Sequence, residues 1–292
     1  MDVMAQARAP FRGWIKAATR VRQVSDCEME VSHMVVTEPN KVMVAGDWHG
    51  NPYWAEQAIK YAKRSGADMI VHVGDYGFWT PSERTYAYLL GSNQLLEELD
   101  MRLIWVDGNH EDHSQLDECN IPGGKPTVFG DLDRIMHLPR GFRWEWWGMT
   151  WMALGGAHSV DRSWRREGHD WWPGEVLSGE QVEYASRPGG VDVIVAHDAP
   201  RGFAIPGIGS GNEFPSEDLL AAESHRGLVR EVVDATKPSL FFHGHYHVNY
   251  RARLEREGGT TEIFGLDRDN STIARNTMFL TREDLGQMVS SR

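Results

Sequence analysis

The sequence predicts an α/β fold in which two mixed β-sheets pack as a sandwich flanked by helices. Three observations predict it: apolar segments of strand length alternate with helical segments in the first half, further strand segments fill the second half, and polar clusters directly follow several strands. Strands that alternate with helices form parallel sheets with crossover helices. Ligands of such sheets gather beyond the carboxyl ends of the strands, so we expect the polar clusters to lie together.

The expected elements follow in chain order. In the first half, buried strands are predicted at Lys41–Ala45, Met69–Val73 and Leu103–Val106, with helices at Pro52–Arg64 and about Ser82–Leu99 between them. In the second half, Phe142–Trp147 and Thr150–Leu154 flank Gly148 and are predicted to form a hairpin, and further strands are expected at Val191–Ala196, Leu240–Phe242, Thr260–Phe264 and Thr277–Leu280. Helices are expected near 178–186 and 215–236.

Two segments differ from this regular pattern. Residues 1–34 are predicted to be a loosely ordered basic extension, in which Arg8, Arg12, Lys16 and Arg20 recur at helical spacing. Residues 35–292 are then expected to form a single domain. Gly202–Asn212 contains four glycines and a proline and is predicted to be a flexible loop that borders the site.

Composition excludes several classes of protein. The formal net charge of −12 repels polyphosphate backbones, so stable nucleic-acid binding is not expected. The two cysteines, Cys27 and Cys119, are too few and too far apart for a disulfide scaffold or a thiolate zinc site. No apolar run approaches the roughly 20 residues that span a bilayer, and no secretory segment is recognisable. We therefore expect a soluble cytoplasmic protein without membrane contact, and leave its oligomeric state open.

Five short polar clusters carry the chemistry. In an extended chain, residues i and i+2 point the same way, so Asp47 with His49, and His245 with His247, are each expected to present two ligands toward one cavity. Imidazole with carboxylate is the ligand set of zinc, iron and manganese rather than of a calcium cage. The clusters are Asp47-Trp48-His49, Gly74-Asp75, Gly108-Asn109-His110-Glu111, His197 and Gly244-His245-Tyr246-His247.

These clusters resemble the motifs of the calcineurin-like metallophosphoesterase superfamily. The pattern of that family is Asp-x-His, Gly-Asp, Gly-Asn-His-Asp/Glu, a single His, and Gly-His-x-His. All five motifs occur here in this order between about residues 41 and 250. A single motif would be weak evidence, whereas five in order are specific. The resemblance implies the four-layer fold of the family, which agrees with the strand pattern.

The resemblance also implies two divalent metal ions. One would be held by Asp47, His49, His247 and a shared Asp75, and the other by Asp75, Asn109, His197 and His245. Manganese is the expected metal, with iron or zinc as alternatives. Two cations about 3.5–4 Å apart need a bridging carboxylate, and a hydroxide held between them attacks phosphorus. His110 would stand free of metal and protonate the leaving group.

The substrate class follows from departures within the superfamily. Protein serine/threonine phosphatases extend the second motif to Gly-Asp-x-x-Asp-Arg-Gly, but here Phe78 replaces the second Asp and the Arg is absent. Purple acid phosphatases place a Tyr at the position of Phe78. The chain therefore looks most similar to bacterial and phage phosphodiesterases of small nucleotides, including 2′,3′- or 3′,5′-cyclic ones. A phosphomonoesterase or protein phosphatase with the same metal site, and a non-catalytic protein-binding scaffold, are the alternatives.

Aromatic and basic residues near residues 144–172 are candidates for the substrate pocket. The hairpin tryptophans are expected to fill the core between the sheets, whereas Trp171 and Trp172 are predicted to face a small phosphoester substrate. Arg162, and with it Arg165 and Arg166, are candidates for neutralising a phosphate. Among the remaining histidines, His72 is expected in the core, His243 is a candidate supporting residue, and His113, His158 and His169 are candidate neighbours of the pocket.

Overall fold

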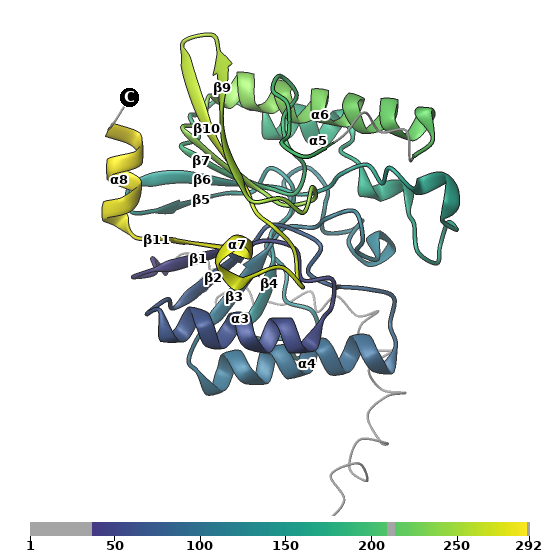
Figure 1. The fold of residues 1–292 in the computed structure, drawn as a ribbon, viewed down its shortest axis with the longest axis vertical. Coiled ribbons are helices and arrows are strands. Elements are labelled where there is room, and N and C mark those ends of the chain that lie inside the picture. Colours follow the sequence, from purple (N-terminus) through teal and green to yellow (C-terminus); the bar gives the residue numbers. More distant parts are fainter. Residues whose placement is uncertain (1–36, 209–213, 291–292) are drawn as a thin grey trace, which may run out of the picture.

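The computed structural model describes residues 37–208 and 214–290, and these stretches form four layers (Figure 1). A pair of helices, one β-sheet, a second β-sheet and a second pair of helices follow one another across the molecule. The two mixed sheets flanked by helices confirm the predicted fold class. The predicted extension 1–34, residue Cys27 and the end of the predicted loop, residues 209–212, lie outside the described residues.

The bounds of the elements agree closely with the expected ones. The described strands are β1 (Val42–Ala45), β2 (Met69–His72), β3 (Arg102–Trp105), β4 (Ile135–His137), β5 (Arg143–Trp146), β6 (Met149–Leu154), β7 (Val193–Ala196), β8 (Leu240–His243), β9 (Tyr250–Arg256), β10 (Gly259–Gly265) and β11 (Thr277–Leu280). The helices are α3 (Pro52–Arg64), α4 (Glu83–Glu98), α5 (Gly179–Ala185), α6 (Ser216–Thr236), α7 (Ile273–Asn276) and α8 (Arg282–Ser290), with short 3₁₀ turns η2 (His113–Gln115), η3 (Arg162–Trp164) and η4 (Pro173–Glu175).

The first sheet has the strand order β11-β1-β2-β3-β4. Strands β1 to β4 run parallel and β11 pairs with β1 antiparallel, so the carboxyl ends of the four parallel strands share one edge. Along β1, Val42 and Val44 face the second sheet, whereas Met43 and Ala45 pack against the layer of α3 and α4. Burial on both faces explains why these strands are continuous apolar runs.

The second sheet has the order β5-β6-β7-β8-β10-β9. Strands β6, β7, β8 and β10 are parallel, and the edge strands β5 and β9 are antiparallel to their neighbours. Helices α5 and α6 cover the outer face, where Ile194 and Phe241 meet Val229 and Val233 of α6. Both sheets therefore direct the carboxyl ends of their parallel strands toward a common region of the molecule (Figure 1).

Tryptophans of the β5–β6 hairpin fill the space between the sheets. Trp144, Trp146, Trp147 and Trp151 are all buried, and the ring centroids of Trp146 and Trp151 lie 5.5 Å apart. The indole nitrogen of Trp147 donates to the carbonyl of Pro39 at 2.8 Å. These contacts confirm that the hairpin tryptophans belong to the core, in preference to a base-stacking surface.

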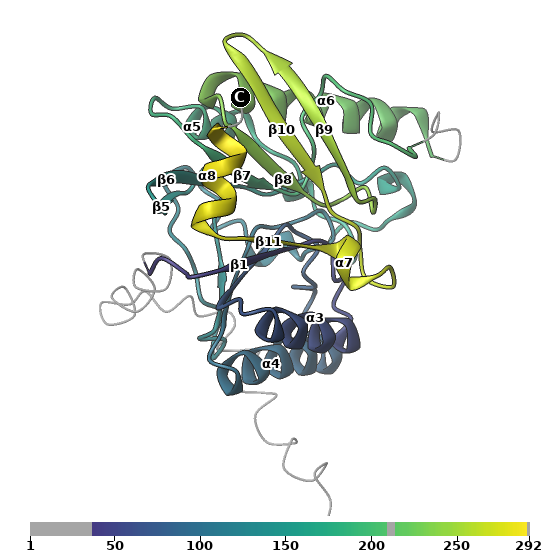
Figure 2. The ribbon, with the colours of Figure 1, turned by 60° about the vertical axis from the view of Figure 1, so that its left-hand side comes forward.

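Several elements were not predicted. Strand β4 has only three residues, and β9 forms a long hairpin with β10 at the sheet edge (Figure 2). In β9 the side chains of Arg251 and Arg253 are 63% and 61% exposed and pair with Glu262, so the strand lacks an apolar run. Helices α7 and α8, at the C-terminal end, were also missed. Within the described ranges, no helix has both the length and the apolar character needed to cross a membrane.

Candidate metal centre

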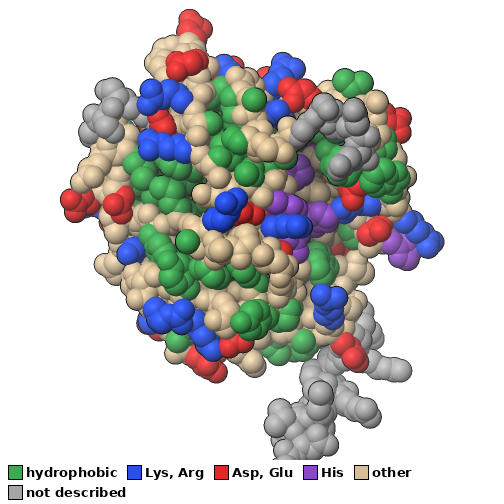
Figure 3. All heavy atoms as spheres, in the orientation of Figure 1, with side chains coloured by type: hydrophobic (Ala, Val, Ile, Leu, Met, Phe, Trp, Pro, Cys, Tyr) green, Lys and Arg blue, Asp and Glu red, His purple; other side chains and the backbone are tan. Residues whose placement is uncertain are grey.

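The predicted ligands meet where the carboxyl ends of the two sheets adjoin. Asp47, Asp75 and Asn109 follow β1, β2 and β3 of the first sheet, whereas His197 and His245 follow β7 and β8 of the second. On the surface of this face, histidine side chains gather in one area with basic side chains beside them (Figure 3). The fold thus brings together residues that are up to two hundred positions apart in sequence.

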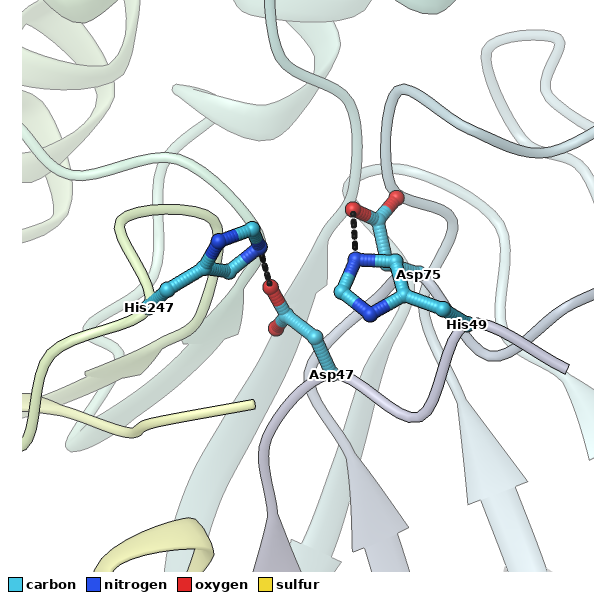
Figure 4. A group of neighbouring side chains, drawn as sticks. All are labelled: Asp47, His49, Asp75 and His247. Atoms are coloured by element: carbon cyan, nitrogen blue, oxygen red, sulfur yellow. Dashed lines mark ion pairs between the residues drawn. The ribbon is translucent and has the colours of Figure 1, made fainter. Parts of the chain in front are cut away.

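A first group consists of Asp47, His49, Asp75 and His247 (Figure 4). Each offers one ligand atom, and these four atoms all lie within 4.8 Å of one another. His247 Nε2 is 3.3 Å from Asp47 Oδ2, and His49 Nε2 is 3.5 Å from Asp75 Oδ2. Two carboxylates facing two imidazoles form a donor set that suits zinc, iron or manganese.

A second group surrounds the other side of Asp75. His197 Nε2 lies 3.4 Å from Asp75 Oδ2 and 3.1 Å from Asn109 Oδ1. The rings of His197 and His245 have centroids 5.0 Å apart. Asp75 therefore stands between the two groups, in the position that a shared ligand requires.

The backbone of these residues corrects the expectation of an extended chain. Four of these residues lie in turns beyond the strand ends. Their backbone φ angles are positive: 47° at His49, 53° at Asp75, 69° at His245 and 53° at His247. Such left-handed conformations of non-glycine residues cost about 1–3 kcal/mol each and cluster at functional sites. As a result, His245 and His247 face different groups. His247 lies against Asp47, whereas His245 packs against His197.

Two glycines allow the carboxylates to lie this close to the neighbouring loops. A Cβ atom at Gly108 would collide with Asp75 Oδ1, and one at Gly244 would collide with Asp47 Oδ1. In their place, the backbone amide of His110 donates to Asp75 Oδ1 at 3.0 Å, and that of His245 donates to Asp47 Oδ2 at 3.0 Å. These hydrogen bonds fix the direction in which each carboxylate points.

The electrostatics of the site demand positive charge. Burial would lower the pKa of His197, but the carboxylates of Asp75 and Asp47 raise that pKa to about 10. Burial likewise opposes the charge of His49, whose pKa is raised to about 10 by Asp269 and Asp75. The buried carboxylates therefore hold protons on two imidazoles. Divalent metal ions would supply the same charge more effectively, since metal binding displaces protons from its ligands.

The surroundings of Asp75 Oδ2 show that the residues fit a metal ion. This atom is buried and accepts no hydrogen bond among the described residues. The Nε2 atoms of His49, His197 and His110 lie 3.5, 3.4 and 3.9 Å from it. These distances are long for hydrogen bonds, and those to His49 and His197 suit side chains that would each share a cation with Asp75.

The protons of two histidines are placed as metal ligands require. His197 Nδ1 lies 2.8 Å from the carbonyl of Val73, and His49 Nδ1 lies 3.0 Å from Asp269 Oδ1. Both partners are acceptors, so each Nδ1 carries a hydrogen and each Nε2 faces the centre. An outward hydrogen bond of this kind accompanies almost every metal-binding histidine.

Asp269, in the loop between β10 and α7, is a supporting residue that sequence reasoning missed. Besides His49, its carboxylate accepts from Asn51 Nδ2 at 2.7 Å. Its own backbone amide donates to the carbonyl of Asp47 at 2.8 Å. The loop that carries Asp269 is thereby fixed to the proposed ligands Asp47 and His49.

We expect Asp269→Ala to weaken manganese binding about 10–100-fold, because loss of such a supporting carboxylate frees the imidazole ring. Calorimetric titration of Mn²⁺ into the chelator-stripped protein measures this directly. Asp267→Ala is a matched control from the same loop, since the Asp267 carboxylate pairs with Arg275 instead of a histidine. Unchanged manganese affinity of Asp269→Ala, or an equal loss in the control, would contradict the role of Asp269.

Asn109 is oriented by a chain of buried hydrogen bonds. The hydroxyl of Ser159 donates to Glu175 Oε2 at 2.6 Å, and its backbone amide donates to Oε1 at 2.8 Å. The Ser159 oxygen is thereby left to accept from Asn109 Nδ2, at 2.9 Å. This direction of donation turns Asn109 Oδ1 toward His197. Neither Ser159 nor Glu175 was predicted from the sequence.

Two more buried carboxylates fix the loops of the site. Glu111 accepts from the backbone amides of Gly77 and Gly108, at 3.1 and 2.6 Å, and so joins the loops after β2 and β3. Burial, with the nearby charge of Asp75, raises the pKa of Glu111 to about 8. Asp198 accepts from the hydroxyl of Tyr246 at 2.6 Å, which ties the loop after β7 to the loop after β8.

The partner that orients His110, which the sequence did not reveal, is Arg165. Arg165 Nη1 lies 2.9 Å from His110 Nδ1, and Nη2 lies 3.3 Å from His110 Nε2. The guanidinium is itself held by Asp161, at 2.8 and 2.9 Å. Burial lowers the pKa of His110 to about 4, with Arg165 adding to this effect and Asp75 opposing it.

The three residues predicted to bind substrate, Arg162, Trp171 and Trp172, lie on the same loop as Arg165. The Arg162 guanidinium lies over the ring of Trp171, 4.7 Å from its centroid, and Trp171 and Trp172 are half-buried. The geometry brings Arg165, in place of Arg162, to His110. Contact of Trp171, Trp172 or Arg162 with a substrate stays a prediction.

The remaining histidines lie around the site. His72 is buried, as expected, with its ring edge-on to that of Trp48. His243 bonds the hydroxyl of Tyr250 at 2.7 Å, and His113 bonds the carbonyl of Gly108 at 2.9 Å. His158 lies near Glu175 and Asp218, at 3.7 and 3.5 Å, whereas His169 is exposed.

Comparison with known proteins finds one matching family model and several similar solved structures. A family model described as calcineurin-like phosphoesterase matches residues 40–249. Among solved structures, TT1561 of Thermus thermophilus is similar at 13% identity and a TM-score of 0.48, over 84% of this chain and 99% of that chain. GAP50, described as the anchor in the inner membrane complex of Plasmodium, is similar at 11% identity and a TM-score of 0.38, over 84% of this chain and 79% of that chain. No curated protein sequence matches the chain.

Proposed function

Because the chain belongs to the calcineurin-like phosphoesterase family, whose model spans residues 40–249, we propose that it hydrolyses small phosphodiesters with two divalent metal ions. The observation that carries this proposal is the position of Asp75. Its Oδ2, which accepts no hydrogen bond among the described residues, lies between the His49 group and the His197 group. A carboxylate shared in this way suits two cations held close together.

The proposed ligands divide into two sets around Asp75. Asp47, His49 and His247 would complete the first set, whereas Asn109, His197 and His245 would complete the second. When bound, the metal ions supply positive charge for the phosphate and lower the pKa of water. Since nitrogen and oxygen donors are mixed, manganese, iron and zinc all suit the sites, and we propose manganese as the physiological metal.

The chain's own residues position the substrate and move protons. His110 stands at the edge of the centre, with Nε2 3.9 Å from Asp75 Oδ2. We assign it the transfer of a proton to the leaving alkoxide. Its backbone amide holds Asp75 at the same time, so the one residue links the proton donor to the shared ligand.

Two features of the site favour diesters over monoesters as substrates. Phe78 is 4% exposed and packs against Trp105 and Phe129, so a core side chain stands where phosphatases of the family carry a carboxylate. Arg165, whose guanidinium contacts His110, is paired with Asp161, which offsets its charge. A monoester dianion carries more negative charge than a diester, and it would need more positive charge beside His110 than Arg165 supplies. The half-buried rings of Trp171 and Trp172 suit a nucleoside, so cyclic nucleotides are the proposed substrates.

We expect chelator-treated protein to be inactive and Mn²⁺ to restore cleavage of bis-p-nitrophenyl phosphate at a higher kcat/KM than cleavage of p-nitrophenyl phosphate. Steady-state assays of both esters across a metal titration measure this, and a screen of 2′,3′- and 3′,5′-cyclic nucleotides follows. Preference for the monoester would make the protein a phosphatase with the same metal site. Turnover of neither ester by protein that binds two equivalents of metal would point to a scaffold.

A further inference from the structure

The loop between β6 and α5, residues 155–178, contacts two residues of the candidate metal centre, through Ser159 on Asn109 and Arg165 on His110. Its position is fixed by the fold at two places. Near its start, Ser163 donates through its backbone and its hydroxyl to Asp218 of α6, at 3.0 and 2.6 Å. Near its end, the buried guanidinium of Arg140 donates to the carbonyl of Gly174 at 2.8 Å.

Arg165, between these anchors, has more hydrogens to donate than the contacts can accept. Nε and one hydrogen of Nη2 serve Asp161, and Nη1 serves the carbonyl of Asp170 at 3.2 Å. One hydrogen of Nη1 and one of Nη2 are then left for His110, whose two ring nitrogens lie at 2.9 and 3.3 Å. The side chain of Arg165 is 13% exposed, so little solvent reaches these groups.

His110 can accept only one of these two hydrogen bonds. A neutral imidazole has one acceptor nitrogen and one N–H, and guanidinium is a donor only. The shorter contact assigns the acceptor to Nδ1, so Nε2 carries the hydrogen. Arg165 Nη2–H and His110 Nε2–H are therefore two donors side by side, and Nε2 lies 3.9 Å from Asp75 Oδ2.

Two adjacent donors, one of them cationic, can together bind one anionic oxygen. We propose that Arg165 is a substrate-binding residue that, with His110, donates to one oxygen of the phosphate group. This inference rests on the proposed function of the metal centre and adds a phosphate contact from outside the family's five motifs. Arg165 takes this role from a loop some 90 residues beyond Asp75, since the second motif itself has no arginine.

The test measures binding of inorganic phosphate to the manganese-loaded protein by calorimetry, together with KM and kcat for bis-p-nitrophenyl phosphate. We expect Arg165→Gln to weaken phosphate binding about 10–100-fold, as for loss of a charge-assisted hydrogen bond. KM should rise with a smaller change in kcat, and the manganese content should not change. Arg165→Lys should recover part of the phosphate affinity, because it keeps the charge without the planar fork.

Arg64→Gln is the control, since Arg64 is an exposed arginine in the last turn of α3 and is not among the candidate phosphate contacts. Its phosphate affinity should equal that of the unaltered protein. Equal phosphate affinity in Arg165→Gln, a loss of manganese in that variant, or no phosphate binding by the unaltered manganese-loaded protein would each overturn the proposal. If neither ester is turned over but phosphate binding still depends on Arg165, the contact stands and the proposed function falls.

Discussion

Replacing Asp75 with alanine is expected to abolish turnover and to remove bound metal from both sites. Asp75 Oδ2 lies within 3.4–3.9 Å of three imidazole nitrogens that belong to both sides of the centre. Its charge is therefore the one that both cations would share. Loss of a single electrostatic contact in an active site costs about 10²–10³ in rate, so loss of a shared ligand should reduce turnover by more than about 10³-fold. Metal content by mass spectrometry and turnover of bis-p-nitrophenyl phosphate measure the two effects.

The control must separate loss of the carboxylate from the strain of its backbone. Asp75 has a φ of 53°, and Asp100, at the end of α4, has a φ of 47° with its side chain 94% exposed. Asp100→Ala thus makes the same substitution in the same backbone conformation, away from the site. It should keep full metal content and turnover. Two equivalents of tightly bound metal in Asp75→Ala would show that the two sites do not share this residue.

The layers of the fold were predictable because their strands are buried on both faces. Continuous apolar segments of strand length between helical or turn segments, such as those of β1 and β7, are typical of buried strands. Strand β9 could not be found in the same way. It lies at the sheet edge, and its outward face carries Arg251 and Arg253, so the apolar pattern is missing.

The candidate ligands were predictable for a related reason, although one part of the argument was wrong. Parallel strands bring their carboxyl ends to one edge, which gathers polar clusters whatever their distance in sequence. The further expectation, that i and i+2 side chains point together, assumed extended chain. His49, His245 and His247 instead use left-handed turns, which non-glycine residues rarely adopt and which apolar patterns do not reveal.

The residues that position the ligands and His110 were not predictable in those roles, although Arg165 was a candidate for neutralising a phosphate. Asp269, Ser159 and Arg165 lie in irregular loops, and each meets its partner across a separation of 50 residues or more. A charged or hydroxyl residue in a loop is most often solvated, so its type alone indicates no partner. Only the packing of the two sheets brings these loops over the ends of the strands.

Replacing His110 with alanine should leave the metals bound and lower the rate about 10²–10⁴-fold on esters with poor leaving groups, as expected when a general acid is lost. Metal binding should survive because the hydrogen bond from residue 110 to Asp75 is donated by the backbone amide, which alanine retains. Nitrophenyl esters should lose less, since nitrophenolate leaves without a proton. Steady-state rates on alkyl and nitrophenyl diesters, with metal content in parallel, measure the difference.

The leaving-group dependence also tests how His110 becomes an acid. In the free protein, burial and Arg165 lower its pKa to about 4, which keeps the ring neutral near pH 7. A phosphate that accepts from Arg165 Nη2 and His110 Nε2 brings negative charge beside the ring and raises that pKa. If Arg165 Nη1 then releases Nδ1, that nitrogen can be protonated from solvent, and the imidazolium can give its Nε2 proton to the leaving alkoxide. Equal losses on good and poor leaving groups would remove His110 from proton transfer and leave it, with Arg165, as a contact to the phosphate.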